Sequence, residues 1–288
     1  MDNFQNINKI YYLGPEGSYA SLAVKKFSSF IFELNKINKI PVKSIKDILS
    51  KIDSDKNSIA ILPIENSIEG IVRETIDNFI NLNDKSIKIF GETTLEINHC
   101  LASKSDTIGT IRHILSHPQA LSQCQNFIFK NFNPENINII PETSTSKALY
   151  KLSDLDNTFS AIGNPILAKE LNLNILYKNI NDEQDNKTRF ILLSRNLQKD
   201  SNGKIKTQII FSTKNQSGAL ADVLFIFKEY KINLTYIDSR PSRRTLGEYI
   251  FLADIEGDVN NSNIRNAIKE IKTKTSYLNI NGSYKIYS

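Results

Sequence analysis

Short apolar runs alternate with helical patterns over the first 195 residues, and this alternation constrains the fold of the chain most strongly. The apolar runs are KIYYLG (9–14), SIAILPIE (58–65) and HILSH (113–117). Segments with helical apolar spacing follow them at residues 18–35, 69–82 and 119–132. This β-α-β rhythm is typical of a mostly parallel sheet with helices on its faces. Since ligands of such folds bind at the carboxyl ends of strands, we expect the site in the loops that follow them.

The rhythm changes after a polar, turn-rich stretch, RNLQKDSNGK, at residues 195–204. Beyond it, strand-like runs and two helical apolar stripes follow one another in the order βαββαβ. This is the order of a ferredoxin-like module. We therefore predict an α/β region over residues 1–195, a linker at 196–204 and a ferredoxin-like domain over 205–288.

Composition and charge argue against several classes of function. The net charge is +5, but basic and acidic residues are mixed throughout, which argues against nucleic-acid binding. Cys100 and Cys124 lack the paired spacing of a zinc or redox motif, so we expect reduced, structural cysteines and no metal. The N-terminus lacks the features of a signal peptide, and no apolar run approaches about 18 residues. We expect a cytoplasmic protein that binds no membrane.

The loop after the first apolar run, GPEGSYAS, is a candidate anion site. Ser18 can cap the following helix, and free N–H groups at a helix N-terminus attract carboxylates and phosphates. The loop lacks the glycine spacing of a dinucleotide fingerprint and the lysine of a phosphate-binding P-loop. A glycine turn that only caps a helix is the alternative interpretation.

A second candidate loop is PIENSIEG, in which Glu65, Asn66 and Ser67 directly follow an apolar run. Gly70 is expected to open the next helix. An acid, an amide and a hydroxyl at a strand end suit ligand binding. A helix cap with Glu65 in solvent explains them equally well.

A third loop, SHPQALSQC, repeats the arrangement. Ser116 and His117 end an apolar run, and Pro118 suits the first turn of a helix that carries Gln119 and Gln123 on one face. We interpret His117 as a structural histidine. Ser116 and His117 do not form a catalytic triad, since adjacent strand residues point to opposite faces.

Taken in order, GPEGSYAS, PIENSIEG, SHPQALSQC, TSTSKA and NKTRF resemble the motifs of prephenate dehydratases. The later segments GAL (218–220) and DSRP (238–241) resemble the ACT regulatory domain that follows in that family. The resemblance covers nearly the whole chain. It implies two α/β lobes, like those of type 2 periplasmic binding proteins, with the site in a cleft between them. The KTRF strand would return to the first lobe and line that cleft.

The resemblance also implies roles for residues. The implied catalytic residues are Thr188, Glu65, Asn66, Ser116 and Gln123. The implied substrate-binding residues are Ser18, Ser67, Arg189 and Phe190. The implied phenylalanine-binding residues of the regulatory domain are Gly218, Ala219, Leu220, Asp238, Ser239, Arg240 and Pro241, at an interface between the subunits of a homodimer or homotetramer.

The chemistry of prephenate suits these residue types. Prephenate carries two carboxylates and a ring hydroxyl, and the ring becomes aromatic as CO₂ and water leave. Aromatisation drives the reaction, so no cofactor is expected, but the leaving hydroxyl needs a proton or a strong hydrogen bond. Thr188 and Glu65 are both candidates for that role, while Arg189 and Ser18 are candidates for the carboxylates.

The sequence departs from the family pattern at several positions and is compatible with two rival functions. Ser18 stands where threonine is usual, Ala20 replaces a frequent hydroxyl, and Ser146 replaces a usual alanine. Asp238 stands for the usual glutamate of the regulatory motif, which bears on the strength of feedback inhibition. The rival functions are an arogenate dehydratase and a non-catalytic sensor with the same two lobes.

Overall fold

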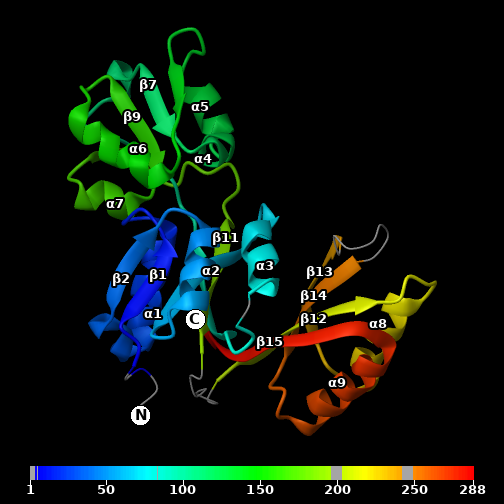
Figure 1. The fold of residues 1–288 in the computed structure, drawn as a ribbon. Helices are drawn as coiled ribbons and strands as arrows, with labels where there is room; N and C mark the ends of the chain where they lie inside the picture. Colours follow the sequence, from blue (N-terminus) through cyan, green and yellow to red (C-terminus); the bar gives the residue numbers. More distant parts are fainter. Residues whose placement is uncertain (1–3, 5, 83, 196–202, 242–248) are drawn as a thin grey trace. The chain divides into compact units, whose positions relative to one another are not determined.

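The computed structural model describes residues 4, 6–82, 84–195, 203–241 and 249–288 (Figure 1). The chain packs into two units. The first unit comprises residues 8–82 and 94–190, and the second comprises residues 1–7, 83–93 and 191–288. Most of the predicted linker at 196–204 lies outside the described residues, which include only Gly203 and Lys204 of it.

The first lobe of the first unit is built on parallel strands joined by helices. Its elements are β1 (Lys9–Leu13), α1 (Tyr19–Phe30), η1 (Phe32–Lys36), β2 (Asn38–Val42), α2 (Ile45–Ser54), β3 (Ser58–Asn66), β4 (Gly70–Ile71) and α3 (Arg73–Ile80). β1 pairs in parallel with both β2 and β3, and β11 (Lys187–Ser194) lies next to β3. The strand that begins at KTRF thus returns to this lobe, as predicted.

The chain after β3 differs from the predicted helix over 69–82. The Asn66 side chain accepts hydrogen bonds from the N–H groups of Ile68 and Glu69, both at 3.0 Å, and so forms a turn. Gly70, with φ of +77°, then begins β4, which runs antiparallel to β3. Because the turn and β4 use these residues, the helix begins only at Arg73.

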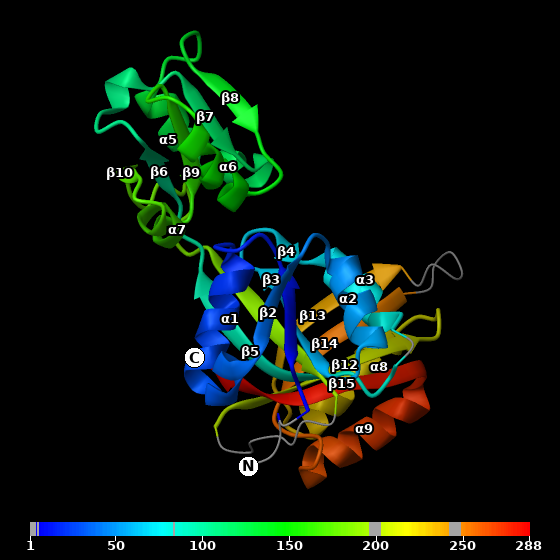
Figure 2. The same cartoon turned by 60° about the vertical axis from the view of Figure 1, so that its left-hand side comes forward.

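The second lobe, green in Figures 1 and 2, holds a sheet with strand order β10-β6-β9-β7-β8. Its strands are β6 (Cys100–Ser103), β7 (His113–Ser116), β8 (Asn138–Pro141), β9 (Phe159–Gly163) and β10 (Asn174–Tyr177). Its helices are η2 (Ile108–Thr110), α4 (Pro118–Ser122), α5 (Gln125–Asn131), α6 (Thr145–Lys151), η3 (Leu152–Asp154) and α7 (Pro165–Glu170). Alternate strand residues face opposite sides, so Leu115 packs with α6 and α7 while Ile114 packs with α4 and α5.

The predicted single helix over 119–132 is two helices, because Asp182 interrupts it. The N–H of Asp182 donates to the Gln123 carbonyl at 2.8 Å, an acceptor that a continuous helix would use itself. The Asp182 carboxylate accepts the N–H of Asn126, at 3.2 Å to either oxygen, near the start of α5. Gln123 therefore ends α4 rather than lying inside a long helix.

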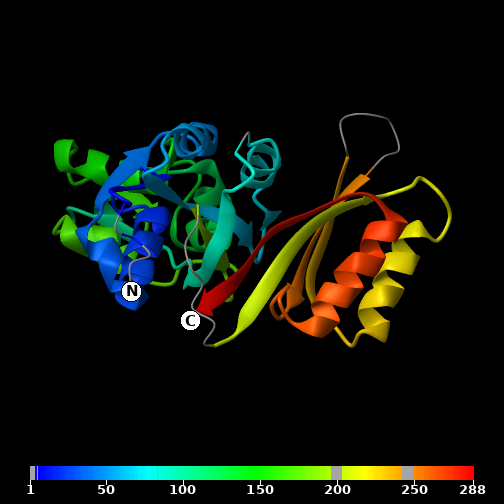
Figure 3. The same cartoon turned by 60° about the horizontal axis from the view of Figure 1, so that its bottom comes forward.

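The second unit contains the predicted ferredoxin-like module. Its elements are β12 (Ile205–Thr213), α8 (Ala219–Glu229), β13 (Leu234–Pro241), β14 (Tyr249–Glu256), α9 (Ser262–Lys274) and β15 (Thr275–Tyr287). The strands are antiparallel in the order β13-β14-β12-β15, and α8 and α9 lie side by side against them (Figure 3). The βαββαβ order is therefore confirmed.

This unit also includes part of β5 (Lys88–Glu96), which pairs in parallel with the end of β15. The Glu92 side chain is buried there and accepts from Lys206 Nζ at 2.7 Å, so a paired charge lies inside the unit. Among the described residues, no helix has the length and apolar character needed to cross a bilayer.

Candidate active site

A cavity of about 520 Å³ lies within the first unit, lined by loops and strand ends of both lobes. The loop after β1, the start of α2 and the end of β3 contribute from the first lobe. The starts of α4 and α6 contribute from the second. The lining includes Ser18, Tyr19, Lys43, Asn66, His99, Gln123, Asn186, Thr188 and Phe190.

Strand alternation divides the predicted site residues into two groups. Asn66, Thr188 and Phe190 line the cavity. Their neighbours Glu65 and Arg189 form an ion pair, with Arg189 Nε 3.0 Å from Glu65 Oε2. Adjacent residues of a strand point to opposite faces, so the residues beside Asn66 and Thr188 are directed elsewhere. The sequence interpretation had placed Thr188 and Arg189 together at the substrate.

Asn66 holds the Thr188 hydroxyl. Asn66 Nδ2 donates to Thr188 Oγ1 at 2.9 Å, and Asn66 itself is oriented by the two backbone N–H groups of its turn. A threonine hydroxyl has one hydrogen to donate and two lone pairs. Because its oxygen accepts from Asn66, the hydrogen of Thr188 is directed to another partner, and the cavity is where a ligand would supply one.

Gln123 and Asn186 extend these contacts. Asn186 Oδ1 accepts from Asn66 Nδ2 at 2.7 Å, and Asn186 Nδ2 donates to Gln123 Oε1 at 3.0 Å. Gln123 Nε2 donates to Glu69 Oε1 at 3.3 Å. Asn66 and Gln123 were both predicted as site residues. Asn186 is the first residue of the NKTRF motif but was not among the predicted site residues.

The three predicted serines mainly bond the backbone. Ser18 caps α1 by accepting from the N–H of Ser21, as predicted, and its own hydrogen goes to the Leu13 carbonyl at 2.8 Å. Ser67 donates to the Asp185 carbonyl at 2.8 Å and accepts from the N–H of Lys187. Ser116 is fully buried and donates to the Ile162 carbonyl at 2.6 Å. Their roles toward substrate stay predictions.

Burial keeps the aromatic and thiol groups of this region neutral. Burial lowers the pKa of His99 to about 4, although a hydrogen bond with Gln123 opposes that shift. Burial raises the pKa of Tyr19, because the phenolate is the charged form of that group, and its hydroxyl donates to the Asn98 carbonyl at 2.6 Å. Cys100 and Cys124 are free and buried, and burial raises the pKa of both thiols to about 12.

Lys43 and His99 were missed by sequence reasoning. Lys43 directly follows β2, so the rule that sites lie after strands pointed to it, but KSIKD contains no distinctive motif. Among the described residues of the lining, Lys43 is the one lysine or arginine. No cluster of three or more metal-ligating side chains occurs in the described part of the chain.

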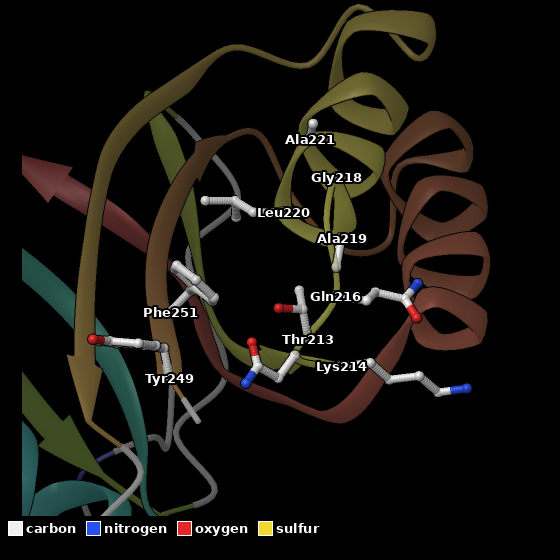
Figure 4. A pocket seen from close by; sticks show the side chains of 10 residues that line it. Thr213, Lys214, Gln216, Gly218, Ala219, Leu220, Ala221, Tyr249 and Phe251 are labelled. Carbon is white, nitrogen blue, oxygen red and sulfur yellow. The ribbon is translucent and has the colours of Figure 1, made fainter. Parts of the chain in front are cut away.

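A second hollow, of about 320 Å³, lies in the ferredoxin-like module (Figure 4). The loop from Thr213 and the start of α8 form one wall, which includes the predicted residues Gly218, Ala219 and Leu220. Tyr249 and Phe251 of β14 form another (Figure 4). The other predicted group, residues 238–241, belongs to β13, outside the lining of this hollow among the described residues.

Comparisons with known proteins identify the family. Residues 10–198 match the family model described as prephenate dehydratase, and residues 207–273 match the ACT domain. The prephenate dehydratase of Methanocaldococcus jannaschii is 38% identical over 96% of this chain and 98% of its own length. That of Lactococcus lactis subsp. lactis is 34% identical over 97% of this chain and 98% of its own.

Solved structures agree. The prephenate dehydratase of Arthrobacter aurescens, solved in complex with L-Phe, has a TM-score of 0.83 at 28% identity, covering 96% of this chain and 89% of its own. That of Staphylococcus aureus has a TM-score of 0.80 at 27% identity, covering 96% and 100%. This chain therefore belongs to the prephenate dehydratase family and carries an ACT domain in its C-terminal part.

Proposed function

We propose that this chain is a carbon–oxygen lyase that converts prephenate to phenylpyruvate, CO₂ and water. The observation that carries the proposal is the pair of Asn66 and Thr188 in the cavity. Asn66 donates a hydrogen bond to the Thr188 hydroxyl oxygen, so the hydroxyl hydrogen of Thr188 is left for a ligand. Family membership and the identity to named prephenate dehydratases support it.

Thr188 is assigned to the leaving oxygen. As the bond between the ring and its carboxylate breaks, the electron pair enters the ring, and the C–O bond on the opposite side breaks. The departing hydroxide takes up one proton from solvent overall, and the hydrogen bond that Thr188 donates to this oxygen stabilises its growing negative charge. Phe190 supplies an apolar wall for the ring that becomes aromatic.

Lys43 and the N-termini of α1 and α2 are assigned to the two carboxylates. Lys43 brings positive charge to the cavity, and both helix N-termini lie in its lining. Free N–H groups and the helix dipole favour an anion there. Arg189, which the sequence interpretation assigned to a carboxylate, already pairs with Glu65.

Glu65 is not placed to protonate the leaving oxygen. A carboxylate that forms an ion pair with a guanidinium accepts hydrogen bonds and has no proton to give. Strand alternation also turns Glu65 away from the face that carries Asn66 and Thr188. We therefore assign Glu65 to holding Arg189, with Ser116 and Ser67 supporting the strands around the site.

Phenylalanine is the proposed allosteric inhibitor, acting on the ACT domain of a homodimer or homotetramer. The family match to the ACT domain and a relative solved with L-Phe support this assignment. The apolar side chains of Leu220 and Phe251, which line the hollow, suit an aromatic side chain. In this proposal Asp238 of a second copy completes the site. We place the enzyme in the cytoplasm and expect it to need no cofactor.

Turnover tests the proposal directly. Purified protein is incubated with prephenate at neutral pH, and phenylpyruvate is measured by its absorbance in alkali, alongside Thr188→Val and Thr188→Ser. We expect product from the wild type, a loss of about 10²- to 10⁴-fold in kcat for Thr188→Val, and partial activity for Thr188→Ser, which keeps the hydroxyl. Product from arogenate but not from prephenate would favour an arogenate dehydratase. Tight binding of prephenate without turnover would favour a sensor.

A further inference from the structure

We propose that Asn186 is a positioning residue of this enzyme. Its side-chain amide bonds Asn66 and Gln123, and it thereby fixes the Asn66 NH₂ group that donates a hydrogen bond to the Thr188 hydroxyl oxygen. The inference rests on the proposed function, because it concerns the orientation of the Thr188 hydroxyl during dehydration. It goes beyond the predicted site, in which Asn66, Gln123 and Thr188 had separate roles and Asn186 had none.

The hydrogen bonds of Asn66 leave it little freedom. Asn66 Nδ2 carries two hydrogens, and its closest acceptors are Asn186 Oδ1 at 2.7 Å and Thr188 Oγ1 at 2.9 Å, with the Lys187 carbonyl at 3.2 Å. Its Oδ1 accepts two backbone N–H groups. The shortest side-chain hydrogen bond of the Asn66 amide is the one with Asn186.

Asn186 must both accept and donate at the end of a short side chain. It accepts from Asn66 and donates to Gln123 Oε1 at 3.0 Å. The reverse orientation would place the Asn186 NH₂ against the NH₂ of Asn66, so the network fixes the orientation. An amide of this length meets both needs, whereas a carboxylate keeps only the acceptor.

The contacts close into a ring. Gln123 Nε2 donates to the Glu69 carboxylate at 3.3 Å, and the N–H of Glu69 donates back to Asn66 Oδ1 at 3.0 Å. Asn66 belongs to the first lobe and Gln123 to the second, so the ring ties side chains of both lobes. Asn186 is the link between the two amides, and it is only 2% exposed.

The backbone at Asn186 is held independently of its side chain. Its carbonyl accepts from the N–H of Ile97 at 2.8 Å, a contact that any substitution retains. Removing the amide therefore takes one hydrogen bond from Asn66 and one from Gln123, while the strand that carries Thr188 keeps its place. A small misplacement of a catalytic donor costs up to about 10²-fold in rate, because the donor no longer meets the transition state.

Asn181 provides a matched control. It is also a buried asparagine, 7% exposed, a few residues earlier in the same segment. Its amide accepts from the N–H of His99 at 2.7 Å and donates to the Ile97 carbonyl at 3.1 Å, so it bonds backbone alone. Asn181→Ala reports the cost of losing a buried amide that has no part in the ring.

The experiment compares the steady-state kinetics and melting temperatures of four proteins: wild type, Asn186→Ala, Asn186→Asp and Asn181→Ala. We expect Asn186→Ala to lower kcat about 10- to 100-fold with KM within about threefold. Asn181→Ala should lower the melting temperature to a similar extent but keep kcat within about threefold. Asn186→Asp, which retains the acceptor for Asn66, should recover part of the lost kcat.

A double-mutant cycle adds a readout that a merely structural residue would not move. If Asn186 acts through Asn66, the double variant Asn66→Ala/Asn186→Ala should lose about as much kcat as the worse single variant. Multiplied losses, or full activity of Asn186→Ala beside an active wild type, would overturn the positioning role alone. A wild type that forms no phenylpyruvate would overturn the proposed function, and the positioning role with it.

Discussion

At the scale of single residues, Lys43 carries the first prediction. In the proposed function prephenate brings two carboxylates into the cavity, and Lys43 is the one lysine or arginine among the described residues of its lining. We assign Lys43 to the side-chain carboxylate, which does not react and is bound alike in the ground and transition states. We therefore expect Lys43→Met to raise KM about tenfold with a smaller effect on kcat. Initial rates over a range of prephenate concentrations measure both constants.

Lys39→Met is the control for Lys43. Lys39 is an exposed lysine of β2, four residues earlier, so its loss changes the net charge equally. A similar rise in KM for both variants would mean that general electrostatic attraction, rather than a contact at the site, draws the substrate. Raising the salt concentration should weaken this general electrostatic attraction in both variants.

His99 carries a pH prediction. Its pKa is about 4 in the folded protein because of burial, against about 6.5 in the unfolded chain. Between these values the unfolded state binds one more proton, so the contribution of His99 to stability is complete above about pH 6.5 and is lost as the pH falls toward 4, by about 1.4 kcal/mol per pH unit. We expect His99→Gln to remove this slope.

Urea unfolding at several pH values between 4 and 7 checks the His99 prediction. The difference in slope between wild type and His99→Gln should correspond to about one proton. Parallel curves would mean that another group, or a rearrangement around His99, accounts for the acid sensitivity. The midpoint alone is insufficient, because the substitution also changes the packing against Tyr19.

Part of the candidate site follows from residue types and motif order. Asn66, Gln123, Thr188 and Phe190, which the resemblance implied, line the cavity, and their roles toward the substrate stay predictions. Alternation is readable from sequence, and it separates Arg189 from Thr188. Asn186 was not foreseeable, because its contacts depend on how the segments of both lobes meet.

At the scale of elements, the helices predicted over 69–82 and 119–132 show the same limit of prediction from sequence. Apolar periodicity predicted helices near α3 and α4–α5 but not where they begin or break. Both boundaries are set by contacts with groups outside the helix. The Asn66 side chain forms the turn before β4, and the Asp182 N–H donates to the Gln123 carbonyl. The second of these partners is remote in sequence, so periodicity carries no trace of it.

Gly17 provides a prediction for the packing of α7. It adopts φ of +74°, and a Cβ there would lie 2.6 Å from Leu167 Cδ1, while its carbonyl accepts from Asn164 Nδ2 at 2.9 Å. Gly17→Ala therefore adds steric overlap to a strained backbone. We expect it to lower the free energy of unfolding by about 2–4 kcal/mol, measured by urea unfolding.

Gly70 separates these two effects. It has nearly the same φ, +77°, but a Cβ there would meet open space. Gly70→Ala should therefore cost only the backbone strain, about 1 kcal/mol. Equal losses for the two variants would mean that Leu167 moves aside and that the close approach contributes little.

At the scale of the whole molecule, the proposed regulation requires two sites that influence each other. Phenylalanine changes turnover only if it binds two states of the protein with different affinity. The predicted regulatory residues fall into two groups within one chain, with Gly218–Leu220 at the hollow of Figure 4 and residues 238–241 on β13. A site completed by a second copy explains why the resemblance assigns both groups to one ligand.

Asp238 carries the last prediction. Asp238→Ala should raise the phenylalanine concentration for half-inhibition at least about tenfold, because the amino group of the ligand loses a charged partner. Each variant is compared with its own uninhibited rate. Asp222→Ala removes an equal charge from the first turn of α8 and should leave inhibition unchanged.

Light scattering with and without phenylalanine tests whether a second copy completes the regulatory site. Inhibition of a protein that stays monomeric at assay concentration would contradict the shared site.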